Sequence, residues 1–380
     1  MAAPDSIRLV FSEPVEAGLS VLTVVSARES VELRVRADST DARVLIADPP
    51  PLDPAEYRVD WRVVSADGHP VEGSYRFTVL PAPGSTDSLP VAPVAPTHAG
   101  PAEGHAGPDL PAAFSAALRG LGMFSLLVLA GWLLQLVALR GEPPAGALRA
   151  ALLLAAGATV FLAAHFVAWL WHVTPADRAP DLAAALGTAP GRVEAARVAL
   201  ALLCLWAIAL ARRPWLALAL ALAAVLVSGA TGHSAGIAPR WSIPIKTLHL
   251  IAVAAWMGGV AWLALAALAP ERFRDSAFRV SGIALGAVVI VALTGLGQAA
   301  LFLPGPGALL SSAYGRLVLA KVAGLAGLVA FGAYNRRRLM PALAAGAEPG
   351  RLRGATRREL VLMLAVSLVA GVLAYVAPPS

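Results

Sequence analysis

The sequence predicts a mixed architecture: a small antiparallel β-sandwich at the N-terminus, followed by an all-α bundle of eight transmembrane helices. Apolar and polar residues alternate from Ile7 to about Leu80, which is typical of half-buried antiparallel strands. From residue 112 onward, apolar runs approach the ~20 residues that a spanning helix needs. Of the whole chain, 58% is hydrophobic and 14% charged, whereas soluble domains average about 25% charged residues. Most of the chain is therefore expected in lipid.

The strand-like part contains four alternating stretches. They are IRLVF (7–11), VELRVR (31–36), YRVDWRV (57–63) and SYRFTV (74–79). Runs that break strands separate them, namely SEP, DPPPLDP and DGHP. Several short strands divided by such turns favour a small sandwich of two sheets.

A linker is expected over residues 81–111, where Pro, Gly and Ala dominate. It contains a short duplication, THAGP and GHAGP, which carries His98 and His105. Two interpretations stay open for these residues. They are either solvated linker histidines or a mobile relay that carries a metal between domains.

The helical part, residues 112–380, contains eight apolar runs. They cover about 113–139, 147–173, 193–211, 214–231, 245–268, 280–303, 315–334 and 359–377. If both chain ends lie outside, fourteen Lys and Arg residues fall in inner loops and seven at outer ends, among them Arg119, Arg197 and Lys246. The inner excess supports this orientation. Because the basic residues lie in short clusters between apolar runs, nucleic acid is excluded as a partner.

The candidate metal-binding side chains in this sequence are mainly histidines. Cys204 is the single cysteine, which excludes a disulfide framework and a cysteine metal cluster. In the predicted topology all seven histidines lie outside or in the outer half of the membrane. Those predicted in or near the spans are His165, His172, His233 and His249.

These four histidines predict a metal entry site, because imidazole suits copper, zinc, iron and nickel and intramembrane polar groups are usually functional. The alternative is that they lie at the interface or bond neighbouring helices. Met257 either supplies a soft sulfur for Cu(I) or fills the core.

Asp67 and His69 stand one residue apart in SADGHPVEGS, between two predicted strands. A carboxylate and an imidazole on a rigid turn are reasonable Cu(II) ligands. Asp-Gly is also a common turn signal. The spacing alone therefore leaves open both a metal site and an ordinary turn.

Longer stretches resemble two known families. RLVFSEPVE and YRVDWRVVSADGHPVEGSYRFTV resemble the CopC family of periplasmic copper-binding proteins. SGATGHSAG, LHLIAVAAWMGGVAWL, AFRVSGIALGAVVIVALTG and AYGRLVLAKVAGLAGLVAFGAYNRRRL resemble the CopD family of copper-transport proteins. The resemblance implies a Greek-key sandwich at 1–80 that holds Cu(II), the linker at 81–111, and a membrane domain at 112–380 that moves or receives copper.

The CopC resemblance also implies site residues. Asp67 and His69 match the copper-binding DGH motif, and Glu13 matches a nearby acid of the SEP stretch. The family's leading histidine and first strand have no counterpart here, and no signal peptide is visible. We expect that the true start lies upstream of Met1. The alternative is a degenerate β domain, with only the membrane part active.

The sequence thus predicts a non-enzymatic copper importer of the bacterial cytoplasmic membrane. Copper would be captured outside, from solution or from other periplasmic carriers, and handed as Cu(I) or Cu(II) to the membrane histidines. Two alternatives remain: a b-type haem electron-transfer protein ligated by His165 and His249, and a copper delivery factor that does not transport.

Overall fold

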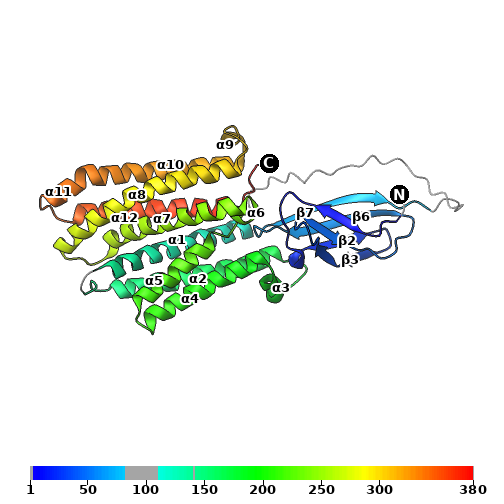
Figure 1. Cartoon of the computed structure of the whole chain (residues 1–380), viewed down its shortest axis with the longest axis horizontal. Helices are drawn as coiled ribbons and strands as arrows, with labels where there is room; N and C mark the ends of the chain where they lie inside the picture. Colours follow the sequence, from blue (N-terminus) through cyan, green and yellow to red (C-terminus); the bar gives the residue numbers. More distant parts are fainter. Residues whose placement is uncertain (1–2, 82–109, 140–141, 380) are drawn as a thin grey trace. The chain divides into compact units, whose positions relative to one another are not determined.

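The strands and helices lie in two separate units of the computed structural model, which describes residues 3–81, 110–139 and 142–379 (Figure 1). One unit comprises residues 1–107 with 170–192, and the other comprises 108–169 with 193–380. The second segment of the first unit is the connection between two long helices. Most of the predicted linker lies outside the described residues, and so do His98 and His105.

The N-terminal residues form two antiparallel sheets, as predicted. One sheet has the order β1-β5-β4, with β1 at Ile7–Val10, β4 at Val35–Ala37 and β5 at Val44–Ala47. The other has the order β3-β2-β6-β7, with β2 at Val21–Val25, β3 at Ser30–Leu33, β6 at Glu56–Val64 and β7 at Pro70–Thr78. Side chains of both sheets meet in one core, including Ile7, Ala47, Leu22 and Val59.

Two details of the predicted strands are wrong. The stretch VELRVR is not one strand: it divides at Arg34 into β3 and β4, which belong to different sheets. Leu33 and Val35 both contact the shared core, so the chain crosses from one sheet to the other there. The strands β2 and β5 were missed. In β5 all four residues are buried, so no alternation marks it.

The segment 170–192 packs with the sheets rather than with the helices. It contains the short helix α3 (Leu182–Gly187). Arg62 donates to the His172 carbonyl at 2.8 Å, and Arg178 pairs with Glu32. The predicted domain bounds of 1–80, 81–111 and 112–380 stay a prediction.

Eight long helices follow in the part of the chain that the structure describes. They are α1 (Leu110–Ala138), α2 (Ala147–Val173), α4 (Ala189–Ala209), α5 (Pro214–Ser228), α7 (Pro239–Leu265), α8 (Pro270–Phe302), α10 (Ala313–Tyr334) and α12 (Gly350–Leu373). Short pieces lie between them: α6 (His233–Gly236), α9 (Ala308–Ser311), the π-helix η2 (Asn335–Leu339) and α11 (Met340–Ala344); a 3-10 turn, η1 (Ala17–Leu19), lies among the strands.

Five helices in the described part of the chain are long and apolar enough to cross a membrane. They cover 112–138, 147–173, 239–265, 270–302 and 313–344. The other three predicted spans form α4, α5 and α12. The helix α5 has only 15 residues, and both α4 and α12 carry charged side chains within the helix. The predicted count of eight spans is therefore confirmed only for five.

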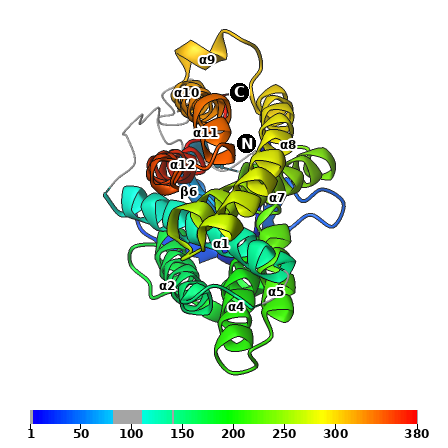
Figure 2. The same cartoon turned by 90° about the vertical axis from the view of Figure 1, so that its left-hand side faces the viewer.

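Close contact between α1 and α7 organises the helices. A Cβ atom at Gly131 would lie 2.0 Å from the Ala254 carbonyl oxygen, and one at Gly258 would lie 2.1 Å from the Gly131 backbone. Glycine at both positions therefore permits the two helix backbones to lie in close contact. Viewed along the helices, α1 and α7 lie between α2, α4 and α5 on one side and α8 and α10 on the other (Figure 2).

Candidate functional site

The turn between β6 and β7 holds the predicted ligands Asp67 and His69. Gly68 has φ +89°, a backbone conformation that glycine adopts most readily. Its N–H donates to the Ser65 carbonyl at 2.9 Å, and the Ser65 N–H donates to the His69 carbonyl at 2.9 Å. Two long paired strands enter and leave this turn, so its side chains start from a fixed backbone.

The side chains of Asp67 and His69 point to one another. His69 Nδ1 lies 2.9 Å from Asp67 Oδ1, and the two side chains are 19% and 6% exposed respectively. The same carboxylate oxygen accepts hydrogen bonds from the His69 N–H at 3.1 Å and from the Ser65 hydroxyl. The turn therefore presents a carboxylate oxygen and an imidazole nitrogen together, a donor pair that suits Cu(II).

The SEP stretch runs beside this turn. The Ala66 N–H donates to the Pro14 carbonyl at 2.8 Å, and the Glu16 N–H donates to the Val64 carbonyl at 2.7 Å. Glu13, half-buried, directly precedes Pro14. Its predicted place near the ligands is consistent with these contacts, and its role stays a prediction.

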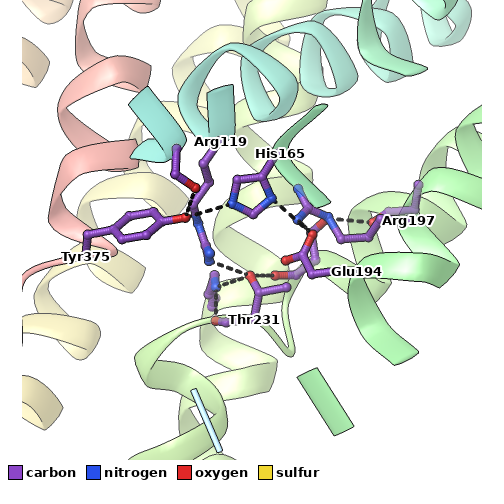
Figure 3. A network of polar contacts seen from close by, with 10 residues as sticks. Arg119, His165, Glu194, Arg197, Thr231 and Tyr375 are labelled. Carbon is purple, nitrogen blue, oxygen red and sulfur yellow. Dashed lines mark hydrogen bonds and ion pairs between the residues drawn. The ribbon is translucent and has the colours of Figure 1, made fainter. Parts of the chain in front are cut away.

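In the helical unit, His165 lies at the centre of a polar network (Figure 3). Its side chain, on α2, is fully buried. Nε2 lies 3.1 Å from the Tyr375 hydroxyl, and Nδ1 lies 3.3 Å from Glu194 Oε2. Both ring nitrogens therefore face protein groups.

The other predicted histidines occupy different surroundings. His249 Nδ1 lies 2.9 Å from the Thr294 hydroxyl. His233, in α6, places Nε2 3.4 Å from the Leu373 carbonyl and its ring edge-on to Phe302 and Tyr314.

His172 lies in the last turn of α2, within the other unit. Met257, on α7, is buried. Among the described residues of the helical unit, no three His, Cys or carboxylate groups bring ligand atoms within 4.8 Å of one another. The structure does not gather the four histidines into one cluster, and their binding of metal stays a prediction.

Sequence reasoning missed the partners of His165. Glu194 Oε2 accepts a hydrogen bond from Arg197 Nη1 at 2.6 Å. Both residues are on α4, and both side chains are buried. The Arg197 side chain is fully buried, although the sequence placed it among outer-end charges. An acid and an arginine three residues apart in an apolar run could have marked this pair.

The motif SGATGHSAG builds another part of the network. A Cβ at Gly229 would lie 2.0 Å from Thr247 Oγ1, so a larger residue there would require the Thr247 side chain to move. Gly232 has φ +60° and lies close to Arg119 Nη2. Between these glycines, Thr231 Oγ1 accepts from Arg119 Nη2 at 3.1 Å and from Lys246 Nζ at 3.0 Å.

A second buried acid, Glu359, lies on another helix, α12. Glu359 accepts from Trp256 Nε1 at 3.3 Å and from Asn335 Nδ2 at 3.2 Å. It lines a cavity of about 280 Å³, together with Arg336, Arg337 and mostly apolar side chains. Sequence reasoning gave this acid no role, although a glutamate at the start of an apolar run indicates an acid within the membrane.

Comparison with known proteins decides the family. Residues 1–80 match the CopC domain, and residues 271–373 match the family described as copper resistance protein D. "Copper resistance protein C" of Escherichia coli is 36% identical over 88 residues, which cover 21% of this chain and 70% of that protein. The chain belongs to the copper resistance CopC/CopD family. It is a multi-pass membrane protein with an N-terminal CopC domain and a C-terminal CopD domain.

Other relatives match a similar share of the chain. "Protein YobA" of E. coli K12 is 42% identical over 83 residues, covering 20% of this chain and 65% of the relative's length. "Copper transport protein CutJ" of Bacillus subtilis is 34% identical over 95 residues, covering 23% of this chain and 17% of that protein. The crystal structure of CopC from Methylosinus trichosporium OB3b has 34% identity and a TM-score of 0.21, covering 23% of this chain and 83% of that one.

Proposed function

We propose that this CopC/CopD protein binds copper at Asp67 and His69, outside the cytoplasmic membrane, and passes it inward through its helical domain. The observation that carries the proposal is the pairing of His69 Nδ1 with Asp67 Oδ1 at 2.9 Å on a fixed turn of the CopC domain. Both are donor atoms that Cu(II) accepts. The partial exposure of His69 leaves the site open to exchange.

The inward path is proposed from the helical domain. We propose that α4, α5 and α12 cross the membrane with the five longer helices, so that both chain ends lie outside and the arginine-rich loops inside. His98 and His105 are proposed to relay copper, and His172, His233, His249 and Met257 to receive it. His165 would act in this path only if copper displaced the Tyr375 hydroxyl from Nε2.

Haem binding by His165 and His249 has no observation in its favour, because both nitrogens of His165 and Nδ1 of His249 already contact protein groups. Copper delivery without transport is the other alternative, and the uptake experiment described below distinguishes it from import. The similarity to a copper transport protein supports transport over delivery alone.

The test is copper uptake by sealed proteoliposomes that contain the full chain. Wild type should accumulate copper in the lumen, and Asp67→Asn with His69→Gln should reduce accumulation at low copper towards that of empty vesicles. Glu29→Gln, on an exposed turn between β2 and β3, is the matched control and should behave as wild type. Copper that binds to wild-type vesicles without entering the lumen would contradict import and favour delivery.

A further inference from the structure

The network around His165 contains more basic than acidic side chains (Figure 3). Arg119 on α1, Arg197 on α4 and Lys246 on α7 converge near Glu194. Glu194 is the one carboxylate within hydrogen-bond reach of these cations among the described residues. The three cations are therefore opposed by a single negative charge.

Distances show how tightly the cations are held together. Arg119 Nη2 and Lys246 Nζ lie 3.1 and 3.0 Å from the same Thr231 hydroxyl oxygen, so the two nitrogens are at most 6.1 Å apart. Lys246 Nζ also donates to the Thr231 carbonyl at 2.5 Å. These partners are neutral, and neither Arg119 nor Lys246 forms an ion pair with any residue that the structure describes. Among the described residues, these two basic groups therefore contact neutral acceptors alone.

Arg197 carries a donor with no acceptor. Its Nη1 bonds Glu194 and its Nε donates to the Ser228 hydroxyl at 3.1 Å. Its Nη2 is buried and has no hydrogen-bond partner among the described residues. A buried N–H group without an acceptor is costly, and so is an uncompensated charge within a membrane-embedded bundle. A negatively charged acceptor would relieve both.

We propose that this network is an anion site that takes a small monovalent inorganic anion, of which chloride is the natural example. The anion would accept from Arg197 Nη2 and lie in the field of Arg119 and Lys246. Its size is limited because the Arg197 side chain is fully buried. Phosphate and sulfate are disfavoured because both are larger than chloride.

This site is distinct from the Asp67–His69 pair and does not depend on copper binding. It has a consequence for any cation that approaches this part of the helical domain. Without an anion, the surplus positive charge repels a metal ion, and with one bound that repulsion falls.

The test uses the purified full chain in detergent, freed of copper with a chelator, and radiolabelled chloride in equilibrium dialysis at constant ionic strength. Wild type should bind chloride saturably, at about one equivalent per chain. Lys246→Gln keeps the Glu194–Arg197 pair, and its chloride affinity should fall about tenfold or more. Arg240→Gln, at the exposed start of α7, is the matched control and should bind as wild type does.

Three results would overturn the proposal. They are no saturable chloride binding by wild type, equal affinity in the Lys246→Gln variant, and competition by sulfate or phosphate stronger than that by bromide. Arg119→Gln provides a second variant if Lys246→Gln does not fold, and unchanged chloride affinity there would also overturn it. Because copper is absent throughout, failure of this site leaves the proposed copper function untouched, and the converse also holds.

Discussion

The two units of the protein each contain a histidine beside a carboxylate, but they build the pair in different ways. In the CopC domain, His69 and Asp67 are two residues apart and 2.9 Å from one another, and one turn holds both. In the helical domain, His165 and Glu194 lie 3.3 Å apart but come from different helices. Tyr375, beyond the end of α12, and Arg197 complete the second pair.

From this difference we expect an exchangeable pair in one unit and a structural pair in the other. His69 is partly exposed and the pair depends on local backbone geometry, so we expect it to lose and regain a ligand without disturbing its domain. The His165–Glu194 pair is buried, and its members hold several helices together. We therefore expect substitutions in the first pair to affect copper binding, and substitutions in the second to affect stability.

The largest effect expected from this comparison follows Glu194→Ala. Arg197 would lose its carboxylate and become an uncompensated buried charge, a change that costs about 3–5 kcal/mol in other proteins. Thermal unfolding of the purified full chain measures it, with Glu348→Ala on an exposed loop as the control. A loss of stability no larger than that of the control would show that the buried pair does not hold the helices.

Gly131→Ala should have the next largest effect. The new Cβ would clash with the Ala254 carbonyl oxygen at 2.0 Å and push α1 from α7, the helices that carry Arg119 and Lys246. Overpacking of this kind typically costs about 1–3 kcal/mol. Gly157→Ala on α2 has no atom within 4 Å of the new Cβ and should be neutral or slightly stabilising. Equal unfolding midpoints for the two variants would contradict the close α1–α7 contact.

The sequence predicted local features of the CopC domain better than contacts between distant parts of the helical domain. The Asp67–His69 pair lies within three residues of the chain, so a short stretch of sequence could indicate that the two side chains are close, and copper binding there stays a prediction. The two sheets were predicted from alternation, whereas β5 was missed because its residues are all buried. The network of Arg119, Glu194 and Tyr375 joins positions that are far apart in the sequence. Only the packing of the helices brings them together, and no single stretch of sequence contains that information.

Gly68→Ala should have a smaller effect that is confined to the CopC domain. Alanine is strained at φ +89°, at a typical cost of about 1–3 kcal/mol, and relief of that strain would move the Asp67 and His69 side chains. We expect weaker Cu(II) binding by the full chain, measured by competition with a chelator of known affinity. Gly18→Ala has open space around the new Cβ and should bind copper as wild type does. Equal affinities would show that the turn geometry does not set the site.

The smallest expected effect concerns an exposed carboxylate of the same domain. The Arg43 side chain and its N–H donate to Asp41 and lower the pKa of Asp41 from 3.8 to about 2. Because the pKa is lower in the folded state, the stabilisation is present above pH 3.8 and is lost as the pH falls through about 2. Asp41→Asn should slightly lower the unfolding midpoint of the β-sheet domain at pH 7, as followed by circular dichroism of the full chain. A difference that persists unchanged to pH 2 would contradict the assignment.

The most direct test of the central claim is electron paramagnetic resonance of the full chain loaded with one equivalent of Cu(II). The account predicts imidazole nitrogen coordination in wild type, and its loss in His69→Gln together with an affinity lower by about tenfold or more. Glu29→Gln should give the wild-type spectrum. An unchanged spectrum and affinity in His69→Gln would show that copper does not bind at this turn.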